Sequence, residues 1–417
     1  MATRAEMWTQ VTDSKGIASR QYVDSLGRTT KTIEAYDGGA VSATANKTTE
    51  YFFDYAGRLS TVQATLPSGK KQQTGYVYGA TFATGSFINS NDVMVATQYA
   101  ASSTNPALDG LASADEQVTQ SVDAAGRTLS TLDRNGTKHV FKYDVLGRVI
   151  SDTVAMRGTT IDNSVRRMEV AYDAQGNAAT MSTYSDVKGG SIVNQVQRTF
   201  NGLGQLTAEY QSHAGAVVTS STPKVGYTYA DPTLGNNGGR QTGLVYPNGR
   251  ALNYNYDSGT DNNISRLSSI ADTSGTLESY QYMGLGTVVV RDHPLSGISL
   301  TYVKKTTEAT GDAGDNYTGL DRFGRIVDQR WVKNVGGTVT DVDRFQYSYD
   351  RNSNIVSRVN ALDSTKNETY TYDNLNQLAS FARGGTTRTQ NFTPDCPEPN
   401  CCRICSRISS VEFWMCL

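Results

Sequence analysis

The sequence predicts an all-β protein in which repeated antiparallel β-hairpins form a curved ribbon or partial β-shell. Three observations predict this class. A pattern of one apolar or aromatic residue, Asp, two variable residues, Gly and Arg recurs along the chain. Tyr-x-Tyr triplets recur as well, and they alternate as strand residues do. The composition combines 24 Tyr and 39 Gly with only 37% hydrophobic residues, which suits half-buried strands and turns better than helices.

The recurring pattern has strict and looser copies, and a repeated motif is the first sign of a repeat architecture. The strict copies begin at Val23, Phe53, Val122, Tyr143 and Leu320. The looser copies are centred on Asp133, Asp173, Asn201, Asp350 and Asp373. The common internal spacing indicates one structural unit used many times.

Each Asp-x-x-Gly segment predicts a type I turn that closes a hairpin, with Asp first and a left-handed Gly last. The Asp carboxylate is suited to accept backbone N–H bonds inside such a turn. In the two most degenerate copies Asn replaces or follows the missing Gly, at Asn376 and Asn354, and Asn tolerates positive φ. The structural turn residues expected from this pattern are Asp24, Gly27, Asp54, Gly57, Asp123, Gly126, Asp144, Gly147, Asp173, Gly176, Asp321, Gly324, Asp350 and Asp373.

The segments that flank the turns read as short strands. "RVIS", "RIVD" and "RLST" alternate after the turn, and successive Asp residues often lie 29 or 30 positions apart, as Asp24 and Asp54 do. That interval accommodates two or more strands. A single hairpin cannot bury its apolar face alone, so neighbouring hairpins must stack into a long meander.

Charge and hydropathy exclude several classes. The formal net charge of −2 gives no footprint for nucleic acid or acidic lipid, and no apolar run has the length of a membrane span. No stretch keeps a helical period. The amino terminus lacks the apolar core of a secretory signal and enters in mid-repeat, which indicates a fragment of a longer chain.

We expect residues 1–390 to form the repeat sheet, with a loop near residues 100–117. Residues 391–417 form a Cys-rich tail that the composition identifies as aberrant or disordered. All the cysteines lie there: Cys396, Cys401, Cys402, Cys405 and Cys416. Half of a zinc site, a redox pair and disulfides are the alternatives for these thiols, and their pairing does not follow from the sequence.

The sequence predicts no enzyme, no cofactor and no metal site. Histidine is the usual proton carrier near neutral pH, and His139, His213 and His293 are scattered among the repeats. Asp257 and Asp261, with Asn262 and Asn263, offer oxygen ligands for calcium, but they fit an enlarged hairpin tip better.

Two further patterns have a structural and a binding interpretation. The segment 235–243 is glycine-rich like a phosphate cradle, yet no helical pattern follows it, which favours a loop. We expect the arginines after the turn Gly to pair with Asp of the same or the next hairpin; a ligand-binding stripe is the alternative. These residues are Arg28, Arg58, Arg127, Arg148 and Arg325.

The motif resembles the YD repeats of the Rhs (rearrangement hotspot) family. The similarity runs from about Gln21 to Ala382, and the segments Tyr246–Asp257 and Tyr370–Ser380 are especially similar. The resemblance implies a β-ribbon spiralling into a hollow shell, as in bacterial polymorphic toxins, insecticidal toxin-complex subunits and teneurin-type surface proteins. It also implies that the shell encloses or presents a variable carboxy-terminal part, and that the protein is secreted or displayed on a cell surface.

The chain departs from the self-cleaving members of that family. They carry an Asp-Pro-x-Gly-Leu type motif after the repeats, and this sequence has no such segment; the partial match at 231–235 lies within the repeats and has a different order. A chain of this length is also short for a closed shell, so we expect an open, curved sheet.

Three functions follow as hypotheses. The first is a non-catalytic scaffold, a fragment of a secreted or cell-surface Rhs-type protein that encapsulates or displays a carboxy-terminal segment. The second is a carbohydrate-binding surface whose tyrosine rows stack on glycans. The third is the shell component of an autoprocessing polymorphic toxin. The expected partners are a polypeptide held by the longer parent protein and, for the second hypothesis, glycans.

Overall fold

A computed structural model describes residues 7–101, 109–159, 161–231, 239–305, 308–384 and 386–389. The tail cysteines, residues 232–235 of the partial cleavage-motif match and residues 235–238 of the glycine-rich segment lie outside the described residues. The predicted fold class is confirmed: the chain is about 54% strand and 3% helix, and its antiparallel sheet is open.

The chain divides into two compact units. Unit 1 contains residues 1–163, 349–356 and 368–417, and unit 2 contains residues 164–348 and 357–367. Unit 1 therefore brings the first repeats together with the last ones. This division cuts across the sequence order, so contiguous segments do not define the units.

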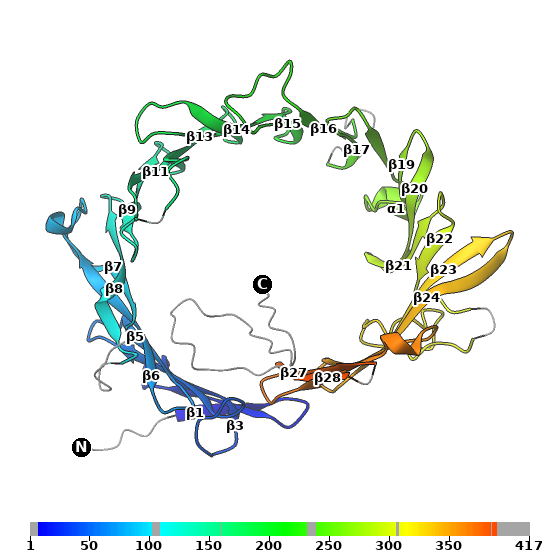
Figure 1. The fold of residues 1–417 in the computed structure, drawn as a ribbon, viewed down its shortest axis with the longest axis horizontal. Coiled ribbons are helices and arrows are strands. Elements are labelled where there is room, and N and C mark those ends of the chain that lie inside the picture. Colours follow the sequence, from blue (N-terminus) through cyan, green and yellow to red (C-terminus); the bar gives the residue numbers. More distant parts are fainter. Residues whose placement is uncertain are drawn as a thin grey trace. The chain divides into compact units, whose positions relative to one another are not determined.

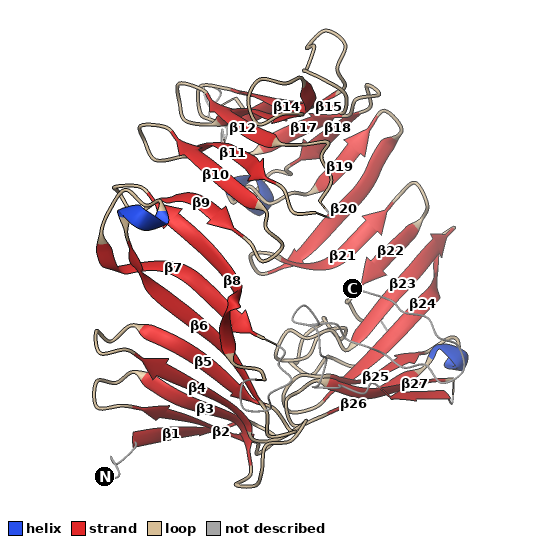
Figure 2. Ribbon diagram, turned by 60° about the vertical axis from the view of Figure 1, so that its left-hand side comes forward, coloured by secondary structure: helices blue, strands red, loops and turns tan. Residues whose placement is uncertain are grey.

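In unit 1, consecutive strands pair antiparallel from β1 to β11, and β26, β27 and β28 pair likewise. Figure 2 shows β1 to β8 side by side. The strands are β1 (Met7–Thr12), β2 (Ala18–Val23), β3 (Thr29–Tyr36), β4 (Lys47–Phe53), β5 (Leu59–Thr65), β6 (Lys71–Ala80), β7 (Ser90–Ala100), β8 (Ala112–Val122), β9 (Thr128–Leu132), β10 (Lys138–Tyr143), β11 (Val149–Met156), β26 (Glu368–Tyr372), β27 (Leu378–Arg383) and β28 (Thr386–Thr389).

Unit 2 is a meander of the same kind, with consecutive antiparallel pairs from β12 to β24 (Figure 1). Its strands are β12 (Arg167–Tyr172), β13 (Ala178–Tyr184), β14 (Ile192–Phe200), β15 (Leu206–Ser212), β16 (Lys224–Tyr229), β17 (Gln241–Val245), β18 (Ala251–Asn255), β19 (Ser269–Asp272), β20 (Gly275–Met283), β21 (Thr287–His293), β22 (Ile298–Thr301), β23 (Asp328–Val335) and β24 (Thr338–Tyr349). The strand β25 (Ile355–Asn360) contributes residues to both units.

The helical segments among the described residues are single turns at loops. They are η1 (Phe82–Thr84), α1 (Thr260–Asn263) and η3 (Ser364–Lys366). Within the described part of the chain, no helix has the length and apolar character needed to cross a bilayer. The strands β7 and β8 reach Ala100 and Ala112, so regular pairing extends into the range near 100–117 where we expected a loop; residues 102–108 lie outside the described residues.

The register explains how strand pairs meet the turns. In seven hairpins the register shifts at the last residue before the turn Asp or Asn, as between Lys142 and Tyr143. Such a shift is the bulge that accompanies a type I turn closed by a left-handed residue. The same local chemistry therefore sets both the turn and the strand register.

The core is thin, and its unit 1 part is built largely from small residues. Most strand residues are half-buried, and Val122 and Ser86 are the largest side chains that are almost fully buried among the described residues. Unit 1 buries Ala35, Ala80 and Ala96, whereas unit 2 buries larger residues such as Phe345. Burial of apolar area contributes little per strand in such a sheet, so polar contacts at the hairpin tips are important for its order.

Candidate functional site

The hairpin tips form a repeated polar lock. In the tip at Asp144, the Gly147 N–H donates to the Asp144 carbonyl oxygen at 3.0 Å. The Asp144 Oδ1 atom accepts from the backbone N–H of Leu146 and of Arg148, each at 2.9 Å. Its Oδ2 atom accepts from Arg148 Nε at 2.7 Å. Gly147 has φ of 82°, the left-handed conformation that the turn requires.

The predicted turn residues all lie at such tips. The bond from the fourth turn residue to the first residue's carbonyl is present in each, with distances of 2.9 to 3.1 Å. The lock with Asp and Arg is repeated in the tips at Asp24, Asp54, Asp123, Asp144 and Asp321.

Looser copies keep the lock with other residues. Asn177 Nδ2 donates to Asp173 Oδ2, and Asn354 Nδ2 donates to Asp350 Oδ2, each at 2.9 Å. The left-handed position of the Asp350 tip is held by Ser353, with φ of 67°, so Asn354 stands in the place of the arginine. In the Asp373 tip, Asn376 takes the left-handed conformation, and the buried Asp373 Oδ2 atom has no hydrogen-bond partner among the described residues.

Arginine and tyrosine side chains also join some hairpins to the next one. The Arg127 guanidinium lies over the Tyr143 ring at 4.6 Å from its centroid, and the Tyr143 hydroxyl donates to the Thr128 carbonyl at 2.7 Å. The same pair of contacts recurs where Arg58 lies over Tyr78. Equivalent pairs in unit 2 are Arg240 with Tyr256 and Arg266 with Tyr282. The contacts of the motif's aromatic residue, Asp, Gly and Arg thus form one connected set.

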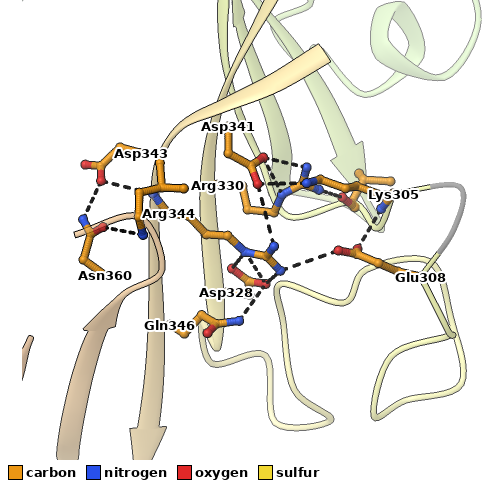
Figure 3. Close-up of polar contacts among 11 residues, drawn as sticks. Lys305, Glu308, Asp328, Arg330, Asp341, Asp343, Arg344, Gln346 and Asn360 are labelled. Carbon is orange, nitrogen blue, oxygen red and sulfur yellow. Dashed lines mark hydrogen bonds and ion pairs between the residues drawn. The ribbon is translucent and has the colours of Figure 1, made fainter. Parts of the chain in front are cut away.

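A partly buried cluster of charged side chains lies in unit 2 (Figure 3). Asp341 accepts from Lys305 Nζ at 2.8 Å and from Arg330 at 2.9 Å. Asp328 accepts from Arg344 Nε at 2.9 Å. Because Arg330 and Arg344 stand directly opposite each other on β23 and β24, these carboxylates separate two like charges.

The cluster continues to both sides. Arg344 also lies 3.6 Å from Glu308, whose Oε2 atom accepts from the Lys305 backbone N–H at 2.8 Å. Asn360 donates to Asp343 Oδ1 at 2.6 Å. The cluster therefore ties the segment after β22 to β23, β24 and β25. The sequence analysis missed it, although the alternation of charge in "DQR" and "DVDR" is a signal that could have indicated it.

Contacts in the cluster shift the pKa values of two of its members, Asp341 and Arg344. Burial alone would raise the pKa of Asp341, but hydrogen bonds from Lys305 and Arg330 hold it below its ordinary value of 3.8. The hydrogen bond to Asp328 raises the pKa of Arg344 above its ordinary value. Asp341 and Arg344 are therefore held in their charged forms at neutral pH.

Each histidine has its own local surroundings. His139 Nδ1 lies 2.7 Å from Asp152 Oδ1 in unit 1, and its ring stacks on Phe141. In unit 2 His293 stacks on Trp331, with centroids 6.3 Å apart, while His213 is exposed. Over the described ranges, no group of three or more His, Cys, Asp or Glu side chains is arranged to hold a metal ion.

The residues considered as calcium ligands lie around the short turn α1, and arginines donate hydrogen bonds to two of them. Asp261 Oδ1 accepts from Arg266 Nε at 2.5 Å, and Asn262 Oδ1 accepts from Arg240 at 2.7 Å. The Asp257 backbone N–H donates to the Ser268 hydroxyl. Guanidinium groups thus provide the positive charge at this tip.

Acidification is expected to destabilise the sheet, because several carboxyl groups have lowered pKa values. Hydrogen bonds from Arg28 and Arg58 hold the pKa of Asp24 and of Asp54 below 3.8. Bonds from Ser274 and Arg250 lower that of Asp272 to about 2. A lowered pKa in the folded state gives stability that is complete above the unfolded value and is lost as pH falls through the folded value.

The expected result is a thermal unfolding temperature that is steady from about pH 7 to 5 and falls steeply below about pH 4. Differential scanning calorimetry across this range measures it. Replacing Asp24 and Asp54 by Asn should flatten the fall, because those positions no longer titrate. An unfolding temperature that rises on acidification from pH 4 would contradict the assignment of these carboxyl groups.

The fold is that of known solved structures, although no protein-family model and no curated protein matches the sequence. The chain is similar to the crystal structure of TcdB2-TccC3, with a TM-score of 0.52 and 12% identity over 91% of this chain and 22% of that one. It is similar to TcdB2-TccC3 without its hypervariable C-terminal region, and to TcdB2-TccC3-Cdc42, each with a TM-score of 0.51, 13% identity, and coverage of 91% of this chain and 21% of the other.

At such low identity, the likeness shows the fold alone. That fold is a series of antiparallel hairpins, in agreement with the tips described above. The chain spans only about a fifth of the length of these solved structures, so their full architecture exceeds what this chain contains.

Proposed function

We propose that this chain is a non-catalytic structural scaffold, part of a secreted or cell-surface Rhs-type protein, and that it encloses or displays the polypeptide that follows its repeats. The observation that carries the proposal is the use of the repeated polar side chains. The Asp and Arg of the tips bond within the tip, and the Tyr and Arg of neighbouring repeats bond to each other. These Asp, Arg and Tyr side chains therefore form contacts that build the sheet.

The fold supports the same proposal. A meander of linked hairpins in each unit gives an extended surface in which each repeat contacts its neighbours. Motif resemblance to Rhs proteins and fold likeness to TcdB2-TccC3 point to the same kind of scaffold. One structure with this fold was solved without a hypervariable C-terminal region, so its parent has a separable carboxy-terminal part.

The alternatives receive less support from the geometry. The Tyr143 and Tyr256 rings carry guanidinium groups on one face, and burial raises the pKa of Tyr227, Tyr254 and Tyr302. Sugar stacking needs exposed ring faces. Glycan binding and autoprocessing remain predictions from the sequence.

Protection of a carboxy-terminal protease site tests enclosure. Two forms of the 417-residue chain carry the same cleavage sequence and epitope, one before Met1 and one after Leu417. Enclosure is expected to slow native cleavage of the carboxy-terminal site at least about tenfold relative to the amino-terminal site, because cleavage then requires local opening.

Denaturation in urea provides the control, since both sites should then be cleaved at equal rates. Equal rates in the native protein would contradict enclosure and leave only display of the following segment. Rapid cleavage throughout the described repeats under native conditions would contradict the scaffold itself, because a linked sheet should resist proteolysis.

A further inference from the structure

Three hairpin tips that are far apart in the sequence meet inside unit 1. They are the tip at residues 13–16 between β1 and β2, the tip at 350–353 before β25 and the tip at 373–376 between β26 and β27. The Ser14 hydroxyl donates to the Arg351 carbonyl oxygen at 2.7 Å and lies 2.6 Å from Asn352 Oδ1, across 337 and 338 positions of sequence. The first repeat therefore contacts the last ones through tips.

Side-chain amides complete this contact. Asn352 Nδ2 donates to Asp13 Oδ2 at 2.7 Å and to Asn376 Oδ1 at 3.0 Å. Asn354 Nδ2 also donates to Asn376 Oδ1, at 2.9 Å. An ion pair between Lys15 Nζ and Asp350 Oδ2, 3.4 Å apart, adds charge attraction. We refer to these contacts of Asp13, Ser14 and Lys15 with the other two tips as the tip clasp.

One difference from the repeat motif explains why Asp13 can bond to the tip of a distant repeat. Asp13 Oδ1 accepts from the backbone N–H of Lys15 and of Ile17, at 2.9 and 2.8 Å, as in the other locks. In those locks an arginine four positions after the Asp occupies Oδ2, as Arg28 does in the Asp24 tip. Ile17 stands in that place here, and its side chain has no donor. The Asp13 Oδ2 atom is therefore open to the Asn352 amide.

We propose that the Asp13 tip is a recognition surface for asparagine-bearing hairpin tips, and that the tip clasp holds strand β1 on the sheet. Among the described strands β1 pairs only with β2, and Met7, Trp8 and Val11 on it are exposed. An edge strand with so little burial frays unless another contact fixes it. The tip clasp is that contact, and it makes the opening of β1 depend on the last repeats.

Hydrogen exchange of the whole chain tests the proposal. Asn352→Ala removes the amide that bonds Asp13 and Asn376, and we expect exchange across residues 7–23 to accelerate about fivefold to thirtyfold. Exchange in the β10–β11 hairpin of the same unit should not change. Gln175→Ala is the matched control, since Gln175 has the same turn position in the Asp173 tip and its described side-chain bond stays within that tip.

A second variant separates loss of the tip clasp from general damage. Ile17→Arg supplies Asp13 with its own guanidinium, as in the Asp24 tip, and leaves Asn352 in place. We expect the tip at 13–17 to exchange more slowly while strand β1 and the 349–356 segment exchange faster. Unchanged exchange across residues 7–12 in both variants would overturn the proposal, as would slower exchange of both segments in Ile17→Arg.

Discussion

Replacing Arg344 by leucine is expected to destabilise unit 2 by roughly 3–5 kcal/mol, because it leaves the buried Asp328 carboxylate without a cation. Arg344 donates to both Asp328 oxygens, and the remaining described contact to that carboxylate is Gln346 at 3.4 Å. Urea unfolding followed by Trp331 fluorescence, with hydrogen exchange over β23 to β25, measures the effect.

Two comparisons make this result specific. Arg322 and Asp312 form an exposed pair in the same unit, with donor–acceptor distances of 2.9 and 2.6 Å, so Arg322→Ala should shift the unfolding midpoint only slightly. Adding Asp328→Asn to Arg344→Leu should restore part of the lost stability, since no unpaired charge then remains buried. An Arg344→Leu variant as stable as Arg322→Ala would contradict the structural role of the cluster.

Replacing Asp123 by alanine is expected to cost about 2–4 kcal/mol of unit 1 stability, because the tip loses several hydrogen bonds at once. The buried Asp123 carboxylate accepts from the backbone N–H of Ala125 and Arg127 and from Arg127 Nε, at 2.8, 2.9 and 2.6 Å. Without it the two N–H groups and the guanidinium lose their acceptor, so the turn loses the side-chain bonds that favour it.

Asparagine at position 123 should cost less than alanine, since its amide oxygen retains the two backbone bonds. The chain already contains such a tip, where Asn201 Oδ1 accepts from the backbone N–H of Leu203 and Gln205. Asp115→Ala on the exposed side of β8 is the control. Thermal unfolding and hydrogen exchange over β8 and β9 measure all three variants. Equal losses for Asn and Ala would assign the effect to charge alone and contradict the turn lock.

The sequence predicted the repeated elements well because each is local. All the bonds of a tip are made by an Asp, the residues two and four positions later, and the Gly between them. A short stretch therefore determines the turn, the bulge and the start of the next strand. The sequence predicted that Arg58 and Arg148 pair with Asp of the same or the next hairpin, and each pairs with the Asp of its own hairpin. The stacking of Arg58 on Tyr78 of the next hairpin adds a contact that the motif order did not reveal.

Small departures from the motif were harder to interpret. Ser353 holds the left-handed position in the Asp350 tip, although the sequence analysis drew attention to Asn354, which instead donates to the Asp350 carboxylate. The Asp13 tip was missed because it lacks both the preceding aromatic residue and the following arginine. Its turn bonds are nevertheless the same, since Asp and Gly alone suffice to form them.

The sequence by itself determined an all-β meander and the position of its tips, since those depend on contacts between residues no more than a few positions apart. Only the tertiary structure decided which distant side chains meet. Lys305 reaches Asp341 across 36 positions, and Ser14 reaches Arg351 across 337. The path of many stacked hairpins fixes such meetings, and a small change in register or twist at each strand pair accumulates along that path. No local sequence pattern specifies this accumulated change in register and twist.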